Sequence, residues 1–538
     1  MRLGATIAGL ALAAALASVF ALQVDDPGFS PGHRGWVSAN TLAVAQRASL
    51  TTGLVGYAVS IAKPDGGRDF YYFDRYPPFF SAALHGAMEL LAGDKAGEIR
   101  VARQAMNLVY ALTVVAAVLL LRELGVGTGA AVAAAALAAS SYTMVEYRDM
   151  VHYDQPALLG SVVLLWAIAA WRRRGSEGAV YAAAMLAVAS GRGYASLPIL
   201  GSWVLLEVVA ARTAGPGRRA GAAAPRGEEE EAAAPGVAAR ALLLGLLVAA
   251  CSLAWNVAVE ARVRGVPWSQ TSIVASATRR LSLDETFNTV REQRLDWGHY
   301  AAIQQRNLAR MAVPWQRRLP FRQRAGAAAG LSSVVLAIAL AFALSRPWPE
   351  RGPWLAMVIA GPAWLALMRN LAAFHPYTSI FYFPLLLVFF SALLHVVPRR
   401  LELVPALLAC ALLVHVTAER NRELGRDAAL AASDTADMAR VAQALEPGDV
   451  VVVDRKVFHG LPFAAAFYLP DQDLAAYTGS TLLLVRAEKV RGKNLTPGNQ
   501  EIFLYRTDEP AKAKASVARQ LPGLLPPDAR ERREPGRP

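Results

Sequence analysis

The chain has 538 residues, of which 54% are hydrophobic, and its mean hydropathy is positive at +0.30. The hydrophobic residues fall in repeated blocks of about 20, enough to cross a bilayer core as a helix, and this excludes an ordinary cytosolic enzyme. The net charge of +13 is explained by arginines that orient membrane loops and contact anionic headgroups. We therefore expect membrane lipids, and no nucleic acid, as partners. Both cysteines lie inside hydrophobic blocks, which argues against a disulfide framework or a cysteine zinc site.

The hydrophobic blocks predict a polytopic α-helical membrane protein with about 11 transmembrane helices. The first block also fits a cleaved signal peptide, but Arg2 is its only basic residue before the apolar run. In chain order the blocks lie at residues 3–22, 104–121, 128–146, 157–171, 178–191, 195–211, 240–259, 326–345, 353–368, 377–397 and 401–416.

Arginine placement predicts the orientation of these helices. With a cytoplasmic N-terminus, the arginine-bearing short loops 171–178, 345–353 and 397–402 all fall inside, as the positive-inside rule requires. The low-complexity linker 212–239 also falls inside, and its composition predicts disorder. The alanine- and arginine-rich composition is typical of a GC-rich bacterium, so we expect the inner membrane, with the outer face in the periplasm.

Two long loops, 23–103 and 260–325, then face outside. The second is rich in arginine, but long loops largely escape the positive-inside rule, and its pattern predicts amphipathic helices on the membrane surface. These loops belong to a membrane domain over residues 1–416.

Beyond residue 416 the membrane pattern stops. The stretches "GDVVVVDR", "STLLLVRAE" and "QEIFLYRT" are typical of short strands. They predict a small periplasmic α/β domain over residues 417–507, followed by a disordered tail over 508–538.

Polar side chains from four separate segments fall on the same, outer side of this topology. Ionisable groups near membrane depth are costly and usually line a functional cavity. Carboxylates beside arginines, histidines and tyrosines suit an anionic substrate together with a proton acceptor. The residues are Asp25, Asp26, Glu146, Arg148, Asp149, His152, Asp154, Arg192, Tyr194, Arg369, His375 and Tyr377.

Each of these residues also has a purely structural interpretation. Asp25 and Asp26 precede Pro-Gly, a turn signal after a helix. Asp154, two residues before Pro156, fits a helix N-cap, and Arg192 fits an interfacial arginine whose head group reaches water. Their joint placement on one side favours the functional interpretation.

Taken together, the motifs resemble the GT-C membrane glycosyltransferases, in particular the branch of protein O-mannosyltransferases and lipid A aminoarabinose transferase. The resemblance covers roughly residues 1–416. "YYFDRYPPFF" contains Tyr76 in a "YPPL"-like motif, and "HYDQPALL" carries an acid at the start of a helix, with a glutamine inserted before the proline. "GRGYASLP" has arginine where lysine is more usual, and "HPY" at 375–377 precedes an apolar run. The stretch "PGFSPGHRGWVSAN" departs from the mannosyltransferase pattern, so the sugar and the acceptor cannot be carried over.

The resemblance implies a polyprenyl-phosphate sugar as donor and a glycan, lipid or protein hydroxyl as acceptor, with inversion at the anomeric carbon. It makes Asp25 or Asp26 the general base and leaves Asp154 either to bind a divalent cation, Mg²⁺ or Mn²⁺, or to orient the acceptor. Arg192, His375 and Tyr377, with Arg369 behind them, would bind the lipid phosphate. Further candidates for binding the donor are His33, Tyr76, Arg148, His152 and Tyr194.

Three other functions fit parts of the pattern. A flippase or transporter for a lipid-linked sugar would use the same basic residues without a base. A polysaccharide ligase or polymerase with a lipid-diphosphate donor would use arginines of the loop 260–325. A non-catalytic scaffold would use the C-terminal domain to bind partners.

Overall fold

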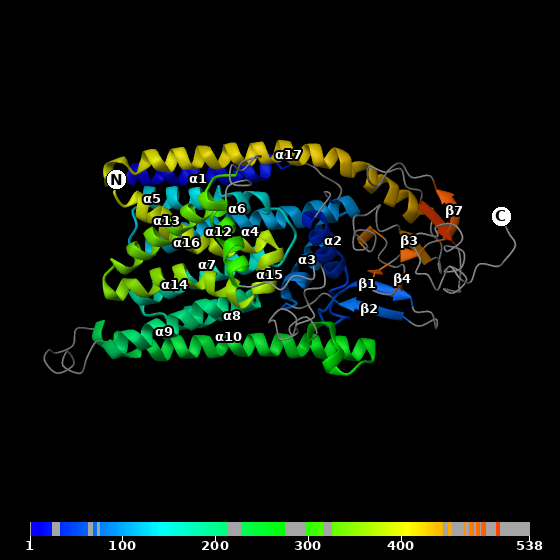
Figure 1. Ribbon diagram of the computed structural model, residues 1–538, viewed down its shortest axis with the longest axis horizontal. Coiled ribbons are helices and arrows are strands. Elements are labelled where there is room, and N and C mark those ends of the chain that lie inside the picture. Colours follow the sequence, from blue (N-terminus) through cyan, green and yellow to red (C-terminus); the bar gives the residue numbers. More distant parts are fainter. Residues whose placement is uncertain are drawn as a thin grey trace.

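The computed structural model describes residues 2–23, 29, 33–62, 68–72, 76–213, 227–274, 297–315 and 325–444, and short segments of the C-terminal part. Those segments are 450–453, 467–468, 473–477, 480–481, 483–484, 486–490 and 502–505. A helical bundle occupies one end of the molecule, and a sheet lies beyond its other end (Figure 1). The asymmetry follows the sequence, in which the membrane pattern gives way to strand signals in the C-terminal part.

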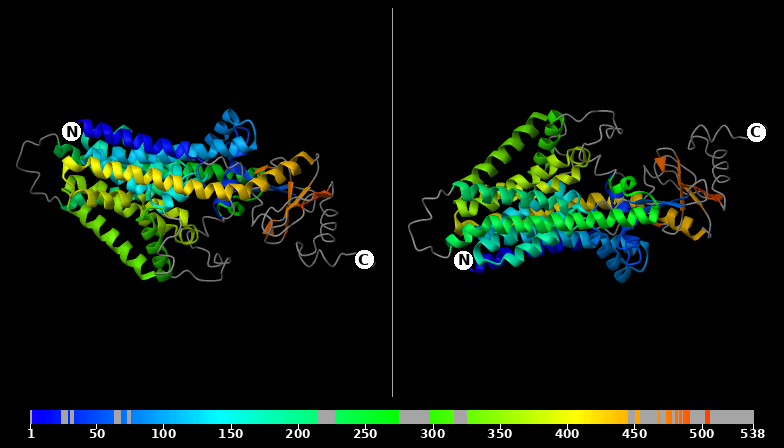
Figure 2. Two further views of the ribbon diagram at one scale, coloured as in Figure 1. Left: turned by 90° about the horizontal axis from the view of Figure 1, so that it is seen from above. Right: turned by 90° about the horizontal axis from the view of Figure 1, so that it is seen from below.

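The bundle consists of long helices joined by short connections. Helices α1 and α17 lie side by side on one flank, and α10 runs along the opposite flank (Figure 2). The helices in chain order are α1 (Arg2–Ala21), α2 (His33–Gln46), α3 (Phe79–Leu91), α4 (Lys95–Glu123), α5 (Thr128–Ala139), α6 (Tyr142–Glu146), α7 (Asp154–Arg174), α8 (Glu177–Ala189), η1 (Gly193–Ser196), α9 (Leu197–Thr213), α10 (Gly227–Arg264), η3 (Trp268–Gln270), α12 (Trp297–Met311), α13 (Ala325–Leu344), α14 (Trp348–Leu367), α15 (Arg369–Phe374), η6 (Pro376–Tyr382), α16 (Phe383–Leu394), η7 (Arg399–Leu401) and α17 (Leu403–Ala444).

Among the described residues, eight helices are long and apolar enough to cross a membrane. The chain is therefore a multi-pass α-helical membrane protein, as predicted. Of the eleven predicted blocks, 128–146 and 178–191 correspond to the short helices α5 and α8, of 12 and 13 residues. At 1.5 Å per residue each is about 20 Å long, less than the bilayer core of about 30 Å. The number eleven is not confirmed.

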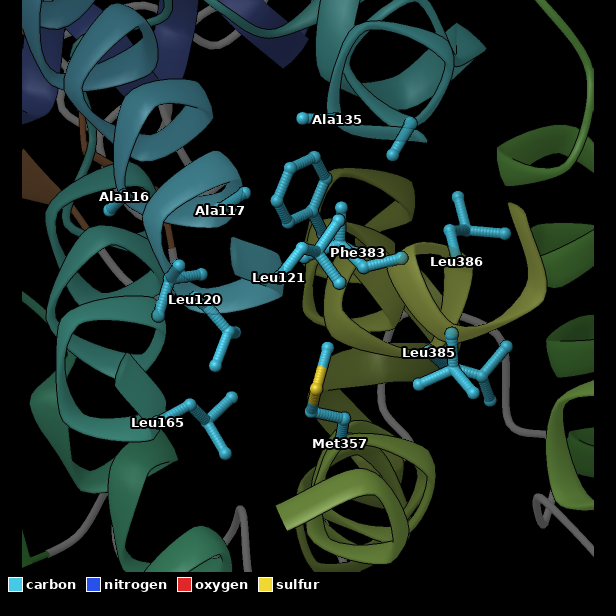
Figure 3. Packing of buried hydrophobic residues seen from close by; sticks show 14 of the residues in the cluster. Ala116, Ala117, Leu120, Leu121, Ala135, Leu165, Met357, Phe383, Leu385 and Leu386 are labelled. Carbon is cyan, nitrogen blue, oxygen red and sulfur yellow. The ribbon is translucent and has the colours of Figure 1, made fainter. Parts of the chain in front are cut away.

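The bundle core shows why a weakly apolar, alanine-rich segment is still inside the protein. Helix α5 is buried along nearly its whole length, and Ala131 and Ala133 to Ala136 are 0% exposed. Inside a bilayer the hydrophobic effect does not drive helices together, so their association depends on close packing, which small side chains allow. Figure 3 shows side chains of α4, α5, α7, α14 and α16 meeting in this core: Ala116, Ala117, Leu120, Leu121, Ala135, Leu165, Met357, Phe383, Leu385 and Leu386.

The sheet joins strands from two distant parts of the chain. Its strand order is β2-β1-β4-β3-β8-β7, with β5 and β6 paired to β4 and β3. The hairpin of β1 and β2 comes from the first long loop, and β1 pairs in parallel with β4 at Ile61↔Leu474 and Ala62↔Ala475. The strands are β1 (Tyr57–Ala62), β2 (Arg68–Tyr72), β3 (Val450–Val453), β4 (Asp473–Tyr477), β5 (Ser480–Thr481), β6 (Leu483–Leu484), β7 (Arg486–Val490) and β8 (Ile502–Tyr505).

This sheet changes the expected division of the chain. The C-terminal part contains strands where the sequence predicts them, and they form one sheet with β1 and β2 of the loop 23–103. The boundaries of a domain over 417–507 stay a prediction. Helix α17 also continues to Ala444, well past the predicted boundary at 416, because the amphipathic stretch after the apolar block keeps good helix formers.

The predicted linker and surface loop also differ in part from expectation. Helix α10 begins at Gly227, so the described part of the linker 212–239 is helical at both ends, and residues 214–226 lie outside the described residues. Four glutamates near the start of α10 favour a helix there, because negative charge stabilises a helix N-terminus. In the loop 260–325, α12 is the predicted kind of amphipathic helix. The tail 508–538 lies outside the described residues.

The shared sheet makes a cross-linking prediction. Neighbouring strands lie about 4.8 Å apart, within the Cα separations that a disulfide bridges. The double variant Ala62→Cys/Ala475→Cys, in a background with exposed Cys251 replaced by serine, should form an intramolecular disulfide under mild oxidation, detected by mass spectrometry. The two single variants are the controls. Absence of the cross-link in folded protein would contradict the pairing of β1 with β4.

Candidate active site

Asp154 is the centre of a buried polar cluster at the start of α7. It is 1% exposed, and its two carboxylate oxygens face different side chains: Oδ1 lies 2.9 Å from Arg192 Nη1 and Oδ2 lies 3.2 Å from His152 Nδ1. Asp154 is the first residue of α7, and no side chain caps that helix. The simple N-cap interpretation therefore does not account for its position.

Arg192 approaches the same carboxylate from the turn between α8 and η1. Its Nη2 donates a hydrogen bond of 2.6 Å to the Tyr76 hydroxyl, and its guanidinium carbon lies 4.8 Å from the Tyr76 ring centre. The same Nη2 lies 3.4 Å from His152 Nε2. Only 1% of Arg192 is exposed, so its head group does not reach water in the way of an interfacial arginine.

The two glycines that flank Arg192 explain how its backbone fits here. The Arg192 amide donates to the Tyr153 carbonyl at 2.9 Å, which ties this turn to the residue before Asp154. Gly191 has a φ of +54°, and a Cβ there would lie 2.2 Å from the Tyr153 carbonyl oxygen. A Cβ on Gly193 would lie 2.1 Å from the Val188 carbonyl oxygen. The "GRG" sequence is thus needed for a close approach of two backbones.

Tyr377 and His375 extend the cluster from the connection between α15 and η6. The Tyr377 ring centre lies 4.9 Å from that of His152 and 5.2 Å from that of His375. Tyr377 is buried, whereas His375 is partly exposed. Aromatic and polar side chains from four separate segments therefore surround the ion pair of Asp154 and Arg192.

A second buried cluster lies on the same connection between α6 and α7. Asp149 forms an ion pair with Arg34 of α2, and Arg148 donates a hydrogen bond to Asn421 of α17. The Asn421 amide in turn donates to the carbonyl of Leu22 at the end of α1. These bonds hold the end of α1, the start of α2 and the middle of α17 together beside the first cluster.

Glu146 of α6 forms another contact with α17, through Arg420. It lies 2.8 Å from Arg420 Nη2 and accepts a 3.0 Å hydrogen bond from Trp315 Nε1. Burial raises the pKa of Glu146, and the nearby guanidinium of Arg420 offsets this only in part. Burial would also raise the pKa of Asp149, but the guanidiniums of Arg34 and Arg148 outweigh it and hold that pKa well below its usual range.

The structure brings together six of the predicted site residues and separates others from them. Arg148 belongs to the neighbouring cluster, and Arg369 lies on α15 with its guanidinium 4.6 Å from the Trp297 ring centre. Tyr194 is on η1, and His33 begins α2, with its side chain outside the description. Asp25 and Asp26 lie outside the described residues. The six that meet are Tyr76, His152, Asp154, Arg192, His375 and Tyr377.

Sequence reasoning did not select Arg34, Trp315, Arg420 or Asn421. Arg34 follows His33 in the stretch after the first helix, and Arg420-Asn421 lies a few residues after the last apolar block. An arginine at such a place is a signal that could have been used, because a charge just beyond an apolar block needs a partner at the membrane boundary. Trp315 carries no such signal.

The predicted cation site at Asp154 fits the observed contacts poorly. Both carboxylate oxygens already face Arg192 and His152, and no group of three or more His, Cys, Asp or Glu residues within the described parts of the chain could hold a metal ion. A guanidinium next to the carboxylate would repel Mg²⁺ or Mn²⁺. Binding of a divalent cation at Asp154 stays a prediction.

The arrangement of helices defines the fold: it is the fold of ArnT, a GT-C membrane protein, as the sequence motifs predicted. The structure is similar to ArnT, the lipid A aminoarabinose transferase of Cupriavidus metallidurans, solved with undecaprenyl phosphate bound. The TM-score is 0.50 at 14% identity, over 88% of this chain and 86% of ArnT.

The archaeal oligosaccharyltransferase AglB of Archaeoglobus fulgidus is more distant. Its apo form gives a TM-score of 0.45 at 14% identity over 76% of this chain. Its complex with an inhibitory peptide and a dolichol-phosphate gives 0.43 at 16% identity over 82%. This chain spans 56% and 60% of the length of those two chains. No family model and no curated protein matches the sequence.

The close approach at Gly191 makes one prediction. Gly191→Ala combines a positive φ with a Cβ against the Tyr153 carbonyl, and strain of this kind costs about 1–3 kcal/mol. We expect a lower thermal midpoint in detergent and loss of function through displacement of Arg192. Gly201→Ala on α9, where a Cβ meets nothing within 4 Å, is the matched control. Equal behaviour of the two variants would show that the turn tolerates a side chain.

The low pKa of Asp149 makes a second prediction. A carboxyl whose folded pKa is depressed stabilises the fold above its unfolded pKa of about 3.9, and this stability is lost as the pH falls through the folded pKa. Asp149→Asn removes the carboxylate from the buried ion pair with Arg34, at a cost of about 3–5 kcal/mol. The difference in thermal midpoint from the wild type should be constant from about pH 5 to 8 and shrink only below about pH 4. A difference that changes near neutral pH would contradict the assigned ion pair.

Proposed function

We propose that the protein is an integral-membrane glycosyltransferase that moves a sugar from a polyprenyl-phosphate donor to an acceptor hydroxyl. The observation that carries the proposal is the buried ion pair of Asp154 and Arg192, surrounded by Tyr76, His152 and Tyr377 at one end of a bundle with the GT-C fold. Fully buried charges near a membrane are costly and are retained where function needs them.

Arg192 is the proposed ligand of the donor phosphate. Its Nη1 faces Asp154 and its Nη2 faces Tyr76, but its Nε has no hydrogen-bond partner among the described residues. A guanidinium held by two partners is pre-organised to stabilise negative charge on a leaving phosphate. The Tyr76 hydroxyl, His152 and Tyr377 add polar groups around the same point. The ArnT structure with bound undecaprenyl phosphate supports a lipid phosphate as the ligand.

Asp154 is better suited to holding Arg192 than to accepting a proton. An aspartate already in contact with a guanidinium and an imidazole is a weak general base, so we assign the base to Asp25 or Asp26. The described end of α1, at Leu22 and Gln23, is fixed by hydrogen bonds from Asn421 and from Asn107, the latter 2.7 Å long. These bonds support a defined start for the segment that carries the two aspartates.

The proposed reaction forms one bond and breaks one bond at the anomeric carbon. The acceptor oxygen attacks from the face opposite the lipid phosphate, and the bond from carbon to phosphate oxygen breaks with inversion. The acceptor proton passes to the aspartate, and the lipid phosphate leaves with its negative charge near Arg192. General-base assistance of this kind is typically worth about 10²–10⁴-fold.

We further propose that the protein resides in a bacterial inner membrane with the site and the sheet on the periplasmic side. The support is the arginine distribution of the loops on the other side. Membrane lipids, the lipid-linked donor and a glycan, lipid or protein acceptor are then its partners.

The test uses protein in lipid nanodiscs with a panel of radiolabelled polyprenyl-phosphate sugars. We expect turnover of at least one donor by the wild type. Replacement of the base, Asp25→Asn or Asp26→Asn, should reduce it about 10²–10⁴-fold, and Asp154→Asn and Arg192→Gln should also reduce it strongly.

Glu207→Gln is the matched control, because Glu207 is also a buried acid in an ion pair with an arginine, Arg172, but lies elsewhere in the bundle. Folding is checked by the thermal midpoint. Absence of turnover of every monophosphate donor by folded protein would contradict the proposal, and so would full activity of both Arg192→Gln and Asp154→Asn.

A further inference from the structure

A cavity lies away from the ion pair, where helices of the first long loop and the start of α4 meet the beginning of β1. Its volume is about 500 Å³, within the range of about 300–1,000 Å³ that is usual for ligand pockets. Its walls come from the end of α2, the start of β1, the second half of α3 and the start of α4. Figure 1 shows these elements on the side of the bundle that faces the C-terminal strands. We call it the outer cavity; its lining includes Gln46, Arg47, Tyr57, His85, Lys95 and Glu98.

The outer cavity is connected to the candidate active site through α3. Tyr76, which contacts Arg192, is followed by two prolines and then by α3. His85, Met88 and Glu89, on the second half of this 13-residue helix, line the outer cavity. With a rise of 1.5 Å per residue, the part of α3 from Phe79 to the cavity residues His85 and Glu89 spans about 9–15 Å. A ligand that extends from the outer cavity along α3 would therefore need several sugar-sized units to reach Arg192.

The charged side chains in the wall are engaged with partners. Lys95 Nζ lies 3.0 Å from Glu98 Oε1, and the Gln46 amide donates a 2.6 Å hydrogen bond to Glu98 Oε2. Arg47 Nη1 donates to the Ala43 carbonyl at 2.8 Å, and its guanidinium lies 4.9 Å from the Tyr57 ring centre.

The remaining acidic side chains of the wall, Asp94 and Glu89, also contact partners. Asp94 accepts a 2.6 Å hydrogen bond from the Gly97 amide at the start of α4. Glu89 lies 3.6 Å from His85 Nε2. The lining thus presents two basic and three acidic side chains, a histidine, an amide and a phenol.

This pattern distinguishes between classes of ligand. An anionic ligand would have to approach Glu89, Asp94 and Glu98, and a cationic ligand would compete with Lys95 for Glu98. A hydroxyl group both donates and accepts hydrogen bonds, so it can bind to paired charges without separating them. Hydrogen bonds in which one partner is ionised are also stronger than neutral ones. The lining therefore suits an uncharged, hydroxyl-rich molecule.

The C-terminal part of the chain supports one wall. Phe467 is fully buried, and its ring centre lies 5.3 Å from Lys95 Nζ. Phe29, from the first long loop, packs edge-on against Phe467 with ring centres 5.2 Å apart. The C-terminal part is thus in contact with the lysine that pairs with Glu98.

We propose that the outer cavity binds a neutral oligosaccharide and that this oligosaccharide is the acceptor, held at a distance from its reacting hydroxyl. The role of the oligosaccharide as acceptor rests on the proposed glycosyltransferase function. The binding of an oligosaccharide in the outer cavity does not depend on that function. It narrows the acceptor from glycan, lipid or protein to an uncharged glycan of several units.

The experiment measures binding and transfer separately in full-length protein in nanodiscs. The probes are neutral gluco-, manno- and galacto-oligosaccharides of two to four units, with oligogalacturonides as anionic counterparts, and binding is followed by isothermal titration calorimetry. We expect saturable binding of at least one neutral probe and none of the anionic series. Glu98→Gln and Gln46→Leu should each weaken binding at least tenfold.

Glu123→Gln is the matched control, since Glu123 lies at the other end of α4 and is paired with Arg174 at 2.6 Å; it should bind like the wild type. Failure of every neutral probe to bind, preference for oligogalacturonides, or unchanged binding by Glu98→Gln and Gln46→Leu would overturn the proposal.

The transfer assay tells the two proposals apart. Binding that depends on Glu98, in a protein that turns over no lipid-linked sugar, would keep the outer cavity and overturn the transferase. Turnover of a donor without any binding of a neutral oligosaccharide would keep the transferase and overturn the proposed binding in the outer cavity. Where both hold, Glu98→Gln should raise KM for the oligosaccharide while hydrolysis of the donor by water is unchanged.

Discussion

The ion pair of Asp154 and Arg192 is the interaction on which the site depends. Both side chains are 1% exposed, and removing either would leave an uncompensated buried charge, at a cost of about 3–5 kcal/mol. A well-packed apolar pair would often be at least as stable as such an ion pair, so stability alone does not explain its presence. Its geometry does: Asp154 fixes Arg192, Arg192 binds Tyr76, and His152 contacts both members of the pair.

The connection between α6 and α7 organises the surrounding helices around this pair. Asp149 binds α2 through Arg34, Arg148 binds α17 through Asn421, and Asn421 binds the end of α1. The short segment between α6 and α7 thus holds the end of α1, the start of α2 and the middle of α17 next to the start of α7.

The sequence was sufficient to predict the features that arise from local pattern. Apolar blocks predicted the helices, and the joint placement of polar motifs predicted that His152, Asp154, Arg192 and Tyr377 would lie together. The parallel pairing of Ala62 with Ala475 was not predictable, because strand partners so far apart in the chain leave no mark on local periodicity. The role of Asn421 was missed for a similar reason, since a buried side-chain bond to the Leu22 carbonyl depends on helix packing. Asp25 and Asp26 remain predicted catalytic residues.

The most direct test of Arg192 as the phosphate ligand is to locate a bound lipid phosphate. A structure of the protein in nanodiscs with undecaprenyl phosphate, determined by electron cryo-microscopy, would locate the phosphate. We expect phosphate oxygens within hydrogen-bonding distance of Arg192, with Asp154 still in contact with the guanidinium, and no bound lipid phosphate in Arg192→Gln. A phosphate bound elsewhere in the bundle, with the pair of Asp154 and Arg192 untouched, would contradict the central claim.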